Sequence, residues 1–376
     1  MNTKSPHHVL EHFYDVAKST HEVPQVKSAA VLRRIEYIVS CLENRACVRL
    51  LMSCMLGKID RPHVDPREPY TKIGGSSSFS GRSYDEQYIT PFINKCSLPC
   101  NSTTAFLTPA LRNIDKPLTT DVALVGRPHR VYRNTLKLLE DVARGRETAE
   151  NVLADTIRLL CSMRDERKKR IETLVSEVGK GRKGAPLSSE EIITLISQHL
   201  AHKNTSRLPV LLVAAAYTAA KNKIDVKVGE LLPHNAADKQ TAALGDVQIC
   251  LTSDDRMITV YEVKQRQVSI DDIDLAVSKI AAHSPQIDNY IFVTTEAVEK
   301  QVVAHARNMY KQLDGVEIAV LDCIGFLQHF LHFFHRLRGK FLDAYQTLVL
   351  TESESAVSHP LKEAFLSLRQ TAESDR

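Results

Sequence analysis

The chain has 376 residues, of which 43% are hydrophobic and 25% are charged, and its formal net charge is +4. This length suits two domains, and the composition is typical of a folded globular protein. The sequence contains no apolar run of membrane-spanning length, so we expect no membrane association, and we expect no secretory leader. The modest positive charge permits a nucleic-acid partner but does not require one.

The eight cysteines are scattered along the chain and do not form the paired spacing of a zinc site. We therefore expect free thiols in a reducing cytoplasm and no structural metal held by cysteine.

Helical periodicity dominates residues 1–58, with a break near Glu43-Asn44, whereas residues 60–128 are rich in Pro, Gly, Ser and Asn. The aromatic residues of the second segment need burial, which argues against disorder, and a long irregular segment in a folded domain is typically functional. The glycine-serine run at residues 74–78 lacks the Lys-Ser/Thr of a phosphate-binding loop, so we expect no nucleotide cofactor. Side chains suited to base edges or phosphates occur here, although ordinary loop hydrogen bonding explains each one separately: Arg82, Asn101, Thr103, Thr104, Arg112 and Asn113.

Residues 129–178 again predict helices, and the mixed-charge run 164–170 is typical of a solvated helix face. Residues 179–184 contain only Gly, Lys and Arg, which is typical of a flexible linker. We place the domain boundary in this linker, which divides the chain into residues 1–184 and residues 185–376.

The second region alternates helices and strands. The pattern predicts helices at 190–200, 206–222, 270–283 and 297–313, and strands at 224–228, 246–251, 257–264, 290–294 and 316–321. Pro209 suits the first turn of its helix, and Ser269 with Asp272 predicts a capping box. The tail from 326 to 350 predicts one long helix or two shorter ones, and we expect the last twenty or so residues to fray.

The strands at 246–251 and 257–264 flank Ser253-Asp254-Asp255-Arg256, which favours a β-hairpin. Glu262 and Lys264 are two residues apart on a strand and therefore share a face. The hairpin can bring Asp246 beside them, so that two carboxylates and one ammonium meet. Two carboxylates suit Mg²⁺, and a neighbouring lysine can orient or activate an attacking water. A surface hairpin with a Glu–Lys pair is the simpler explanation of the tripeptide alone.

Asp246 followed by Glu262-x-Lys264 on the next strand resembles the PD-(D/E)xK nuclease signature, with Gly245 where that pattern often has proline. Several stretches between residues 60 and 300 resemble the SacI-type family of type II restriction endonucleases. They are DPREPYTKIGGSSSFSGRSYDEQYITPFI, LPCNSTTAFLTPALRN, LPVLLVAAAYTAA and HNAADKQTAALGDVQI. The resemblance implies an α/β fold with a mixed α+β sheet: a restriction-endonuclease-like core preceded by a mainly helical N-terminal region that recognises DNA.

The resemblance also implies roles for individual residues. Asp246 and Glu262 are expected to bind Mg²⁺, and Lys264 is expected to position and activate the water that attacks the scissile phosphate. A further acid sometimes comes from a preceding helix, and Glu191 is the candidate. Candidates for DNA contact in the polar loop 234–241 and beside the hairpin are Asn235, Asp238, Lys239, Gln240, Gln248 and Arg266.

The implied protein is a homodimer that cuts both strands of double-stranded DNA at a palindromic site in the bacterial cytoplasm. Two alternatives remain open on the residues alone. One is a repair or defence nuclease of the same fold without a palindromic target. The other is a non-catalytic DNA-binding or scaffolding protein in which Glu262 and Lys264 have no chemical role.

Overall fold

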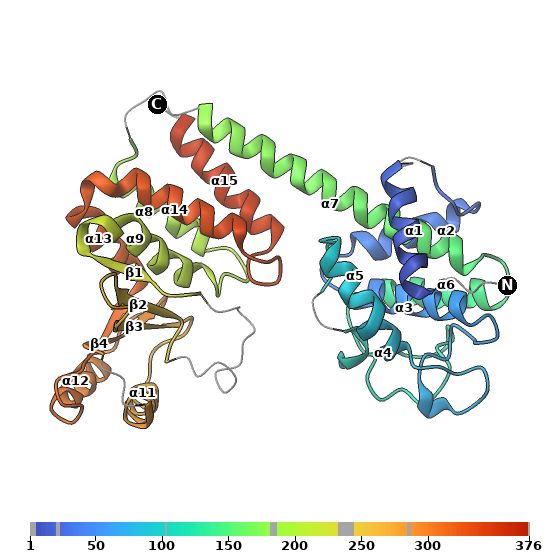
Figure 1. Cartoon of the computed structure of the whole chain (residues 1–376), viewed down its shortest axis with the longest axis horizontal. Helices are drawn as coiled ribbons and strands as arrows, with labels where there is room; N and C mark the ends of the chain where they lie inside the picture. Colours follow the sequence, from blue (N-terminus) through green and yellow to red (C-terminus); the bar gives the residue numbers. More distant parts are fainter. Residues whose placement is uncertain are drawn as a thin grey trace. The chain divides into compact units, whose positions relative to one another are not determined.

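The chain forms two compact units, Met1–Lys169 and Arg170–Arg376 (Figure 1). The computed structural model describes residues 5–19, 23–101, 104–180, 186–231, 244–283 and 287–374. No helix within these ranges is both long and apolar enough to cross a membrane.

The first unit is helical. Its longer helices are α1 (Pro6–Ser19), α2 (Ala29–Ser40), α3 (Ala46–Asp60), α6 (His129–Ala143) and the first part of α7 (Ala149–Lys180). Residues 46–57 of α3 are all buried, because the other helices of this unit and the loop-rich segment pack around it. The break predicted near Glu43-Asn44 separates α2 from α3 and is confirmed.

The segment between α3 and α6 is loop-rich and contains only short helical pieces. These are η1 (Thr71–Ile73), α4 (Gly81–Tyr84), η2 (Asp85–Ile89), α5 (Thr90–Lys95) and η3 (Ala105–Leu107). Its aromatic side chains enter the core of the unit, as the composition predicted: Phe79, Tyr84, Phe92 and Phe106 are buried. Burial of these rings stabilises a backbone that few regular hydrogen-bond ladders hold together.

The division between the units falls within α7, at Lys169/Arg170, and not after residue 184 as the linker composition predicted. The reason is that Ile171, Leu174 and Val175, on the last turns of α7, pack against the core of the second unit. Apolar contacts therefore decide the boundary. Residues 181–185 of the expected linker lie outside the described residues.

The second unit is built on a five-stranded mixed sheet in the order β1-β2-β3-β4-β5. The strands are β1 (Val226–Val228), β2 (Val247–Leu251), β3 (Met257–Lys264), β4 (Asn289–Thr294) and β5 (Glu317–Asp322). The first three strands are antiparallel, and β3, β4 and β5 are parallel. This α+β architecture confirms the predicted fold class and is consistent with a restriction-endonuclease-like fold.

Helices cover both faces of the sheet (Figure 1). One face packs against α9 (Leu208–Ile224) and α13 (Cys323–Phe333), and α8 (Ser189–Leu200) and α14 (Arg338–Thr351) pack on these two helices in the same core. The other face packs against α11 (Ile270–His283) and α12 (Lys300–Asn308). Pro209 lies in the first turn of α9, as predicted, and residues 208–216 of this helix are all buried. The helix continues to Ile224, two residues further than expected, and ends where Asp225 adopts a left-handed conformation.

The expectation that the last twenty residues fray is wrong. The predicted tail helix is two helices, α13 and α14, and a further helix, α15 (His359–Ser374), follows them. Leu361, Phe365 and Leu366 of α15 are buried in the same core as α8, so apolar burial holds the helix in place. All eight cysteines are free thiols, as expected.

Candidate active site

The hairpin predicted around residues 246–264 is present, and β2 pairs with β3 so that Val247 lies opposite Tyr261. Val247 and Tyr261 face the core under α9 and α13, whereas Val260 faces the core under α11. Because side chains alternate along a strand, Glu262 and Lys264 follow Val260 on the α11 side of the sheet.

Asp246 is fixed beside Glu262 by two hydrogen bonds. Its backbone N–H donates to the carbonyl oxygen of Tyr261 (2.8 Å), and its Oδ2 accepts from the N–H of Val263 (2.7 Å). Tyr261 and Val263 are the two neighbours of Glu262 in β3, so these bonds bring the carboxylates together at one end of the hairpin. Asp246 is exposed as a residue, whereas the surrounding atoms partly desolvate its carboxylate.

Gly245 explains how the chain can come so close to β3. A Cβ atom at this position would lie 2.6 Å from Val260 Cγ1 and 2.7 Å from the backbone oxygen of Tyr261. Both distances are shorter than van der Waals contact. Glycine fits at position 245 because this approach leaves no room for a side chain.

Glu262 is buried and surrounded by donors. Lys264 Nζ lies 2.6 Å from its Oε1, Lys279 Nζ lies 3.3 Å from its Oε2, and the Tyr290 hydroxyl also donates to Oε2. Lys279 comes from α11 and Tyr290 from β4, so three elements converge on this carboxylate.

A third acid, Asp272, lies close to the positively charged side chains of Lys264 and Arg266 at the end of β3. Arg266 donates to both of its carboxylate oxygens (2.7 Å each), and Lys264 Nζ lies 3.9 Å from Oδ1. Asp272 also accepts from the N–H of Ser269 (2.9 Å) while its own N–H donates to Ser269 Oγ (3.2 Å). The predicted capping box is therefore confirmed.

The surroundings shift the two carboxylates of the site in opposite directions. For Asp246, desolvation raises the pKa, and the negative charge of Glu262 adds to this effect against the Val263 hydrogen bond and the charges of Lys264 and Arg207. For Glu262, desolvation also acts to raise the pKa. The hydrogen bonds from Lys264 and Tyr290 and the charges of Lys264 and Lys279 outweigh it, and the net pKa is lowered.

The donor set fits a small hard cation. Asp246 and Glu262 supply carboxylate oxygens, and Mg²⁺ commonly takes one or two protein carboxylates and fills its other positions with water and substrate phosphate. Within the described ranges, no three side chains of His, Cys, Asp or Glu gather in a way that could hold a metal ion by themselves. The arrangement thus suits a cation shared with a substrate.

The other candidates beside the hairpin differ in position. Arg266 is exposed and paired with Asp272. Gln248 is half-buried, and its backbone carbonyl oxygen accepts from the N–H of Gly229 (2.7 Å). Glu191, the candidate further acid, accepts from the N–H of Ser188 (2.6 Å) in the capping box of α8. Its carboxylate therefore has a structural role at that helix start.

The DNA-contact candidates of the first unit are mostly exposed. Arg82 pairs with Glu86 (2.7 Å), Arg112 and Asn113 lie in an exposed turn, and the carbonyl oxygen of Asn101 accepts from buried Arg49 (2.5 Å). Thr104 is buried and accepts from the N–H of Phe106, which is a local capping role. Thr103 and the loop candidates lie outside the described residues: Asn235, Asp238, Lys239 and Gln240.

Sequence reasoning missed Lys279 and Tyr290. Lys279 interrupts the apolar stripe of α11, which also contains Ile273, Ala276 and Ile280. A lysine among the buried positions of an amphipathic helix was a usable signal, because such a cation needs a partner. Tyr290 gave no comparable signal, since an aromatic residue in a buried strand is ordinary.

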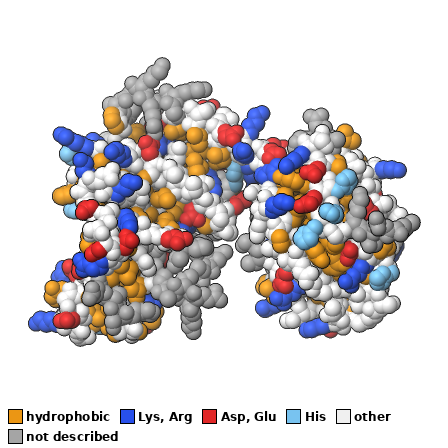
Figure 2. All heavy atoms as spheres, viewed as in Figure 1, with side chains coloured by type: hydrophobic (Ala, Val, Ile, Leu, Met, Phe, Trp, Pro, Cys, Tyr) orange, Lys and Arg blue, Asp and Glu red, His pale blue; other side chains and the backbone are white. Residues whose placement is uncertain are grey.

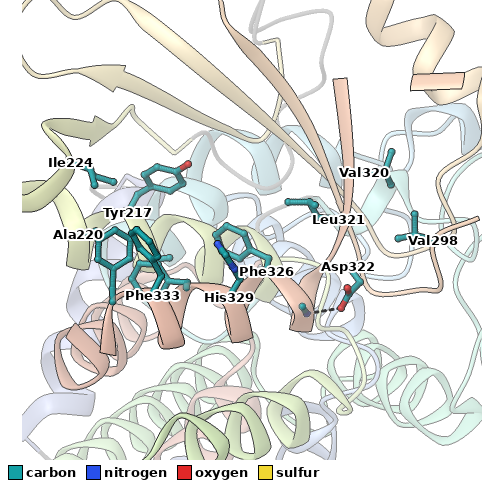
Figure 3. Close-up of a pocket in the computed structure, with 14 residues that line it drawn as sticks. Tyr217, Ala220, Ile224, Val298, Val320, Leu321, Asp322, Phe326, His329 and Phe333 are labelled. Carbon is teal, nitrogen blue, oxygen red and sulfur yellow. Dashed lines mark hydrogen bonds between the residues drawn. The ribbon is translucent and has the colours of Figure 1, made fainter. Parts of the chain in front are cut away.

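An apolar cavity of about 530 Å³ lies elsewhere in the second unit, between α9, β5 and α13 (Figure 3). Tyr217, Phe326 and Phe333 line it, and Phe333 is 70% exposed. Its described lining includes neither the two carboxylates nor Lys264. His329 lines this cavity and stacks on Phe333.

Lys and Arg side chains are interspersed with acidic and apolar ones on the visible face of the second unit in Figure 2. Charge on that face therefore does not single out a nucleic-acid surface, and the local site carries more information than the charge pattern.

Comparison with known families identifies the second unit. Residues 185–296 match the family model of the SacI restriction endonuclease C-terminal domain. The matched range begins before α8, includes β4, and contains Asp246, Glu262 and Lys264. No curated protein matches the chain.

This part of the second unit is therefore similar to the C-terminal domain of SacI restriction endonuclease, which supports a SacI-type restriction endonuclease family. The match supports a nuclease domain that acts on DNA.

Proposed function

We propose that the protein is a type II restriction endonuclease of the PD-(D/E)xK superfamily, which hydrolyses phosphodiester bonds of double-stranded DNA at a specific site with Mg²⁺. The observation that carries the proposal is the convergence of Asp246, Glu262 and Lys264 at the end of the hairpin. It occurs within the region matched by the SacI domain.

In this proposal Asp246 and Glu262 bind the metal ion, whereas Lys264 acts on the attacking water. Asp246 and Glu262 would hold the cation, which when bound would supply Lewis-acid stabilisation of the phosphate and lower the pKa of a water. Lys264 orients that water for in-line attack and stabilises the developing negative charge. Asp272 keeps Lys264 close to the site, since its carboxylate lies 3.9 Å from the ammonium.

A type II enzyme that cuts both strands of a palindrome needs two centres related by a two-fold axis, so we propose a homodimer. We further propose that the exposed candidates of the first unit, Arg82, Arg112 and Asn113, contribute to DNA contact, together with Arg266 of the second unit.

The test is digestion of a long DNA of known sequence with Mg²⁺, followed by sequencing of the fragment ends. We expect discrete fragments with a common end sequence, no cutting when EDTA removes the metal, and no cutting by Asp246→Ala or Glu262→Ala although DNA binding persists. Smeared or structure-dependent products favour a repair or defence nuclease of the same fold. Full cleavage by Glu262→Ala removes the assigned site.

A further inference from the structure

The Glu262 carboxylate already has three protein donors without any cation from solution. Two ammonium groups and one hydroxyl contact its two oxygens, and the side chain is only 11% exposed. A divalent cation that binds Glu262 must therefore compete with these donors for the two carboxylate oxygens.

Two of the three donors have a second acceptor at hand. The Tyr290 hydroxyl has one proton and lies 2.9 Å from the carbonyl oxygen of Leu244, so it can donate there instead of to Glu262. Lys264 has Asp272 at 3.9 Å. Their release from Glu262 does not leave a buried donor unsatisfied, which lowers its cost.

The ammonium group of Lys279 lies where it would repel a metal ion bound to Glu262 and compete with it for the carboxylate. Its Nζ lies 3.3 Å from Glu262 Oε2 and its side chain is 20% exposed, so the ammonium sits at the edge of the site. It lies seven residues after Asp272 on α11, two helical turns along the same face, so one helix supplies both an acid and a base to the site.

The charges of this group also balance. Asp246, Glu262 and Asp272 carry three negative charges, and Lys264, Lys279 and Arg266 carry three positive ones. A divalent cation added to a neutral group gains less Coulomb energy than one added to an anionic group. Loss of the Lys279 charge would leave the group anionic.

We propose that Lys279 is a positioning residue that competes with the divalent cation for Glu262 and thereby sets the cation affinity of the DNA-free enzyme. This inference rests on the proposed function, because it takes Glu262 as a metal ligand. It implies that the site holds the cation weakly until the phosphate of DNA adds negative charge, and by linkage the cation strengthens DNA binding by the same factor.

The test is a titration of the full chain with Mn²⁺, without DNA, followed by isothermal calorimetry at fixed pH and ionic strength. Lys279→Met removes the competing charge while keeping the length of the side chain, and we expect it to bind Mn²⁺ about five-fold more tightly than the wild type. Lys279→Arg keeps the charge and should retain the wild-type affinity.

Controls separate this role from a structural one. Lys300→Met changes an exposed lysine of α12 and should leave the affinity unchanged, and Glu262→Gln should remove the binding. A residue that only supports the fold would weaken binding when replaced, so unchanged or weaker binding by Lys279→Met overturns the inference. If that result accompanies metal-dependent cutting by the wild type, the proposed function stands. Absence of Mn²⁺ binding together with absence of cutting by the wild type refutes both.

Discussion

At the scale of single residues, Asp246 and Glu262 stand in opposite electrostatic situations. The pKa of Asp246 is raised, so its charged form is less favourable in the folded protein than in the unfolded chain. The pKa of Glu262 is lowered, so its charged form is favoured by folding. One carboxylate is held at a cost to stability, and the other contributes to stability.

These directions predict that two inactivating substitutions change stability with opposite sign. At pH 7, Asp246→Asn removes a disfavoured charge and should raise Tm, whereas Glu262→Gln leaves Lys264 and Lys279 without their shared anion and should lower it. The contribution of Glu262 should be lost as pH falls through its lowered pKa. Differential scanning calorimetry at pH 7 checks the signs, and a fall in Tm of several degrees for Asp246→Asn would contradict the interpretation.

At the scale of elements, the buried His199 connects three helices. Its ring nitrogens lie 3.1 Å from the hydroxyl of Tyr345 in α14 and 3.0 Å from the carbonyl oxygen of Leu361 in α15, while His199 itself belongs to α8. Burial lowers the pKa of His199 from 6.5 to about 4, against the hydrogen bond to Leu361 that acts to raise it. The neutral ring is the form that fits this junction.

The second unit should therefore lose stability as pH falls from 6.5 to about 4. In this range His199 is protonated in the unfolded chain but stays neutral in the folded protein, so protonation favours unfolding. The loss attributable to this residue is about 3 kcal/mol. Urea unfolding as a function of pH measures it. His199→Gln should be less stable at pH 7 but lack this part of the slope, while His202→Gln, at an exposed position nearby, should keep it. An unaltered slope in His199→Gln would refute the assignment.

The start of β2 depends on the close approach at Gly245. Gly245→Ala places a methyl group against the backbone of Tyr261 and should shift Asp246 away from Glu262. We expect a destabilisation of about 1–3 kcal/mol and a larger loss in cleavage rate than stability alone explains.

Gly339→Ala in α14 is the matched control, because nothing lies within 4 Å of the Cβ it introduces. It should keep full cleavage activity. Denaturant unfolding together with cleavage assays distinguishes the two variants, and normal activity of Gly245→Ala would show that the approach is not needed for catalysis.

At the scale of the whole molecule, each unit has its own core. The buried residues of the first unit's core extend to Cys161, whereas those of the two cores beside the sheet begin at Val178 and at Leu244. The residues expected to perform chemistry all lie in the second unit. The proposed division of roles assigns DNA recognition to the first unit, whose exposed polar side chains include Arg82 and Arg112.

The proposed homodimer predicts a specific product from mixed subunits. Each centre cuts one strand, so dimers that combine a wild-type subunit with a Glu262→Ala subunit should nick supercoiled plasmid and should not linearise it. Agarose electrophoresis separates nicked circles from linear DNA. Efficient linearisation by purified mixed dimers would mean that one centre cuts both strands.

The sequence by itself determined the features that depend on local periodicity and short-range chemistry. The alternation of residues 247–251, the turn at 253–256 and the capping pair Ser269 and Asp272 each involve neighbours along the chain, and the structure has all of them. The proximity of Asp246 and Glu262 could be predicted from the sequence for the same reason, since a hairpin joins residues that are close in sequence.

Only the tertiary structure shows which side chains from distant segments contact one another. Lys279 and Tyr290 reach Glu262 from the next helix and the next strand, and no local pattern specifies which buried carboxylate they contact. Helix α15 is stabilised because Phe365 is buried in the core that also contains residues of α8. The unit boundary falls within α7 because apolar side chains near the end of α7 pack against the same core. Burial depends on partners far along the chain, and only the folded structure identifies them.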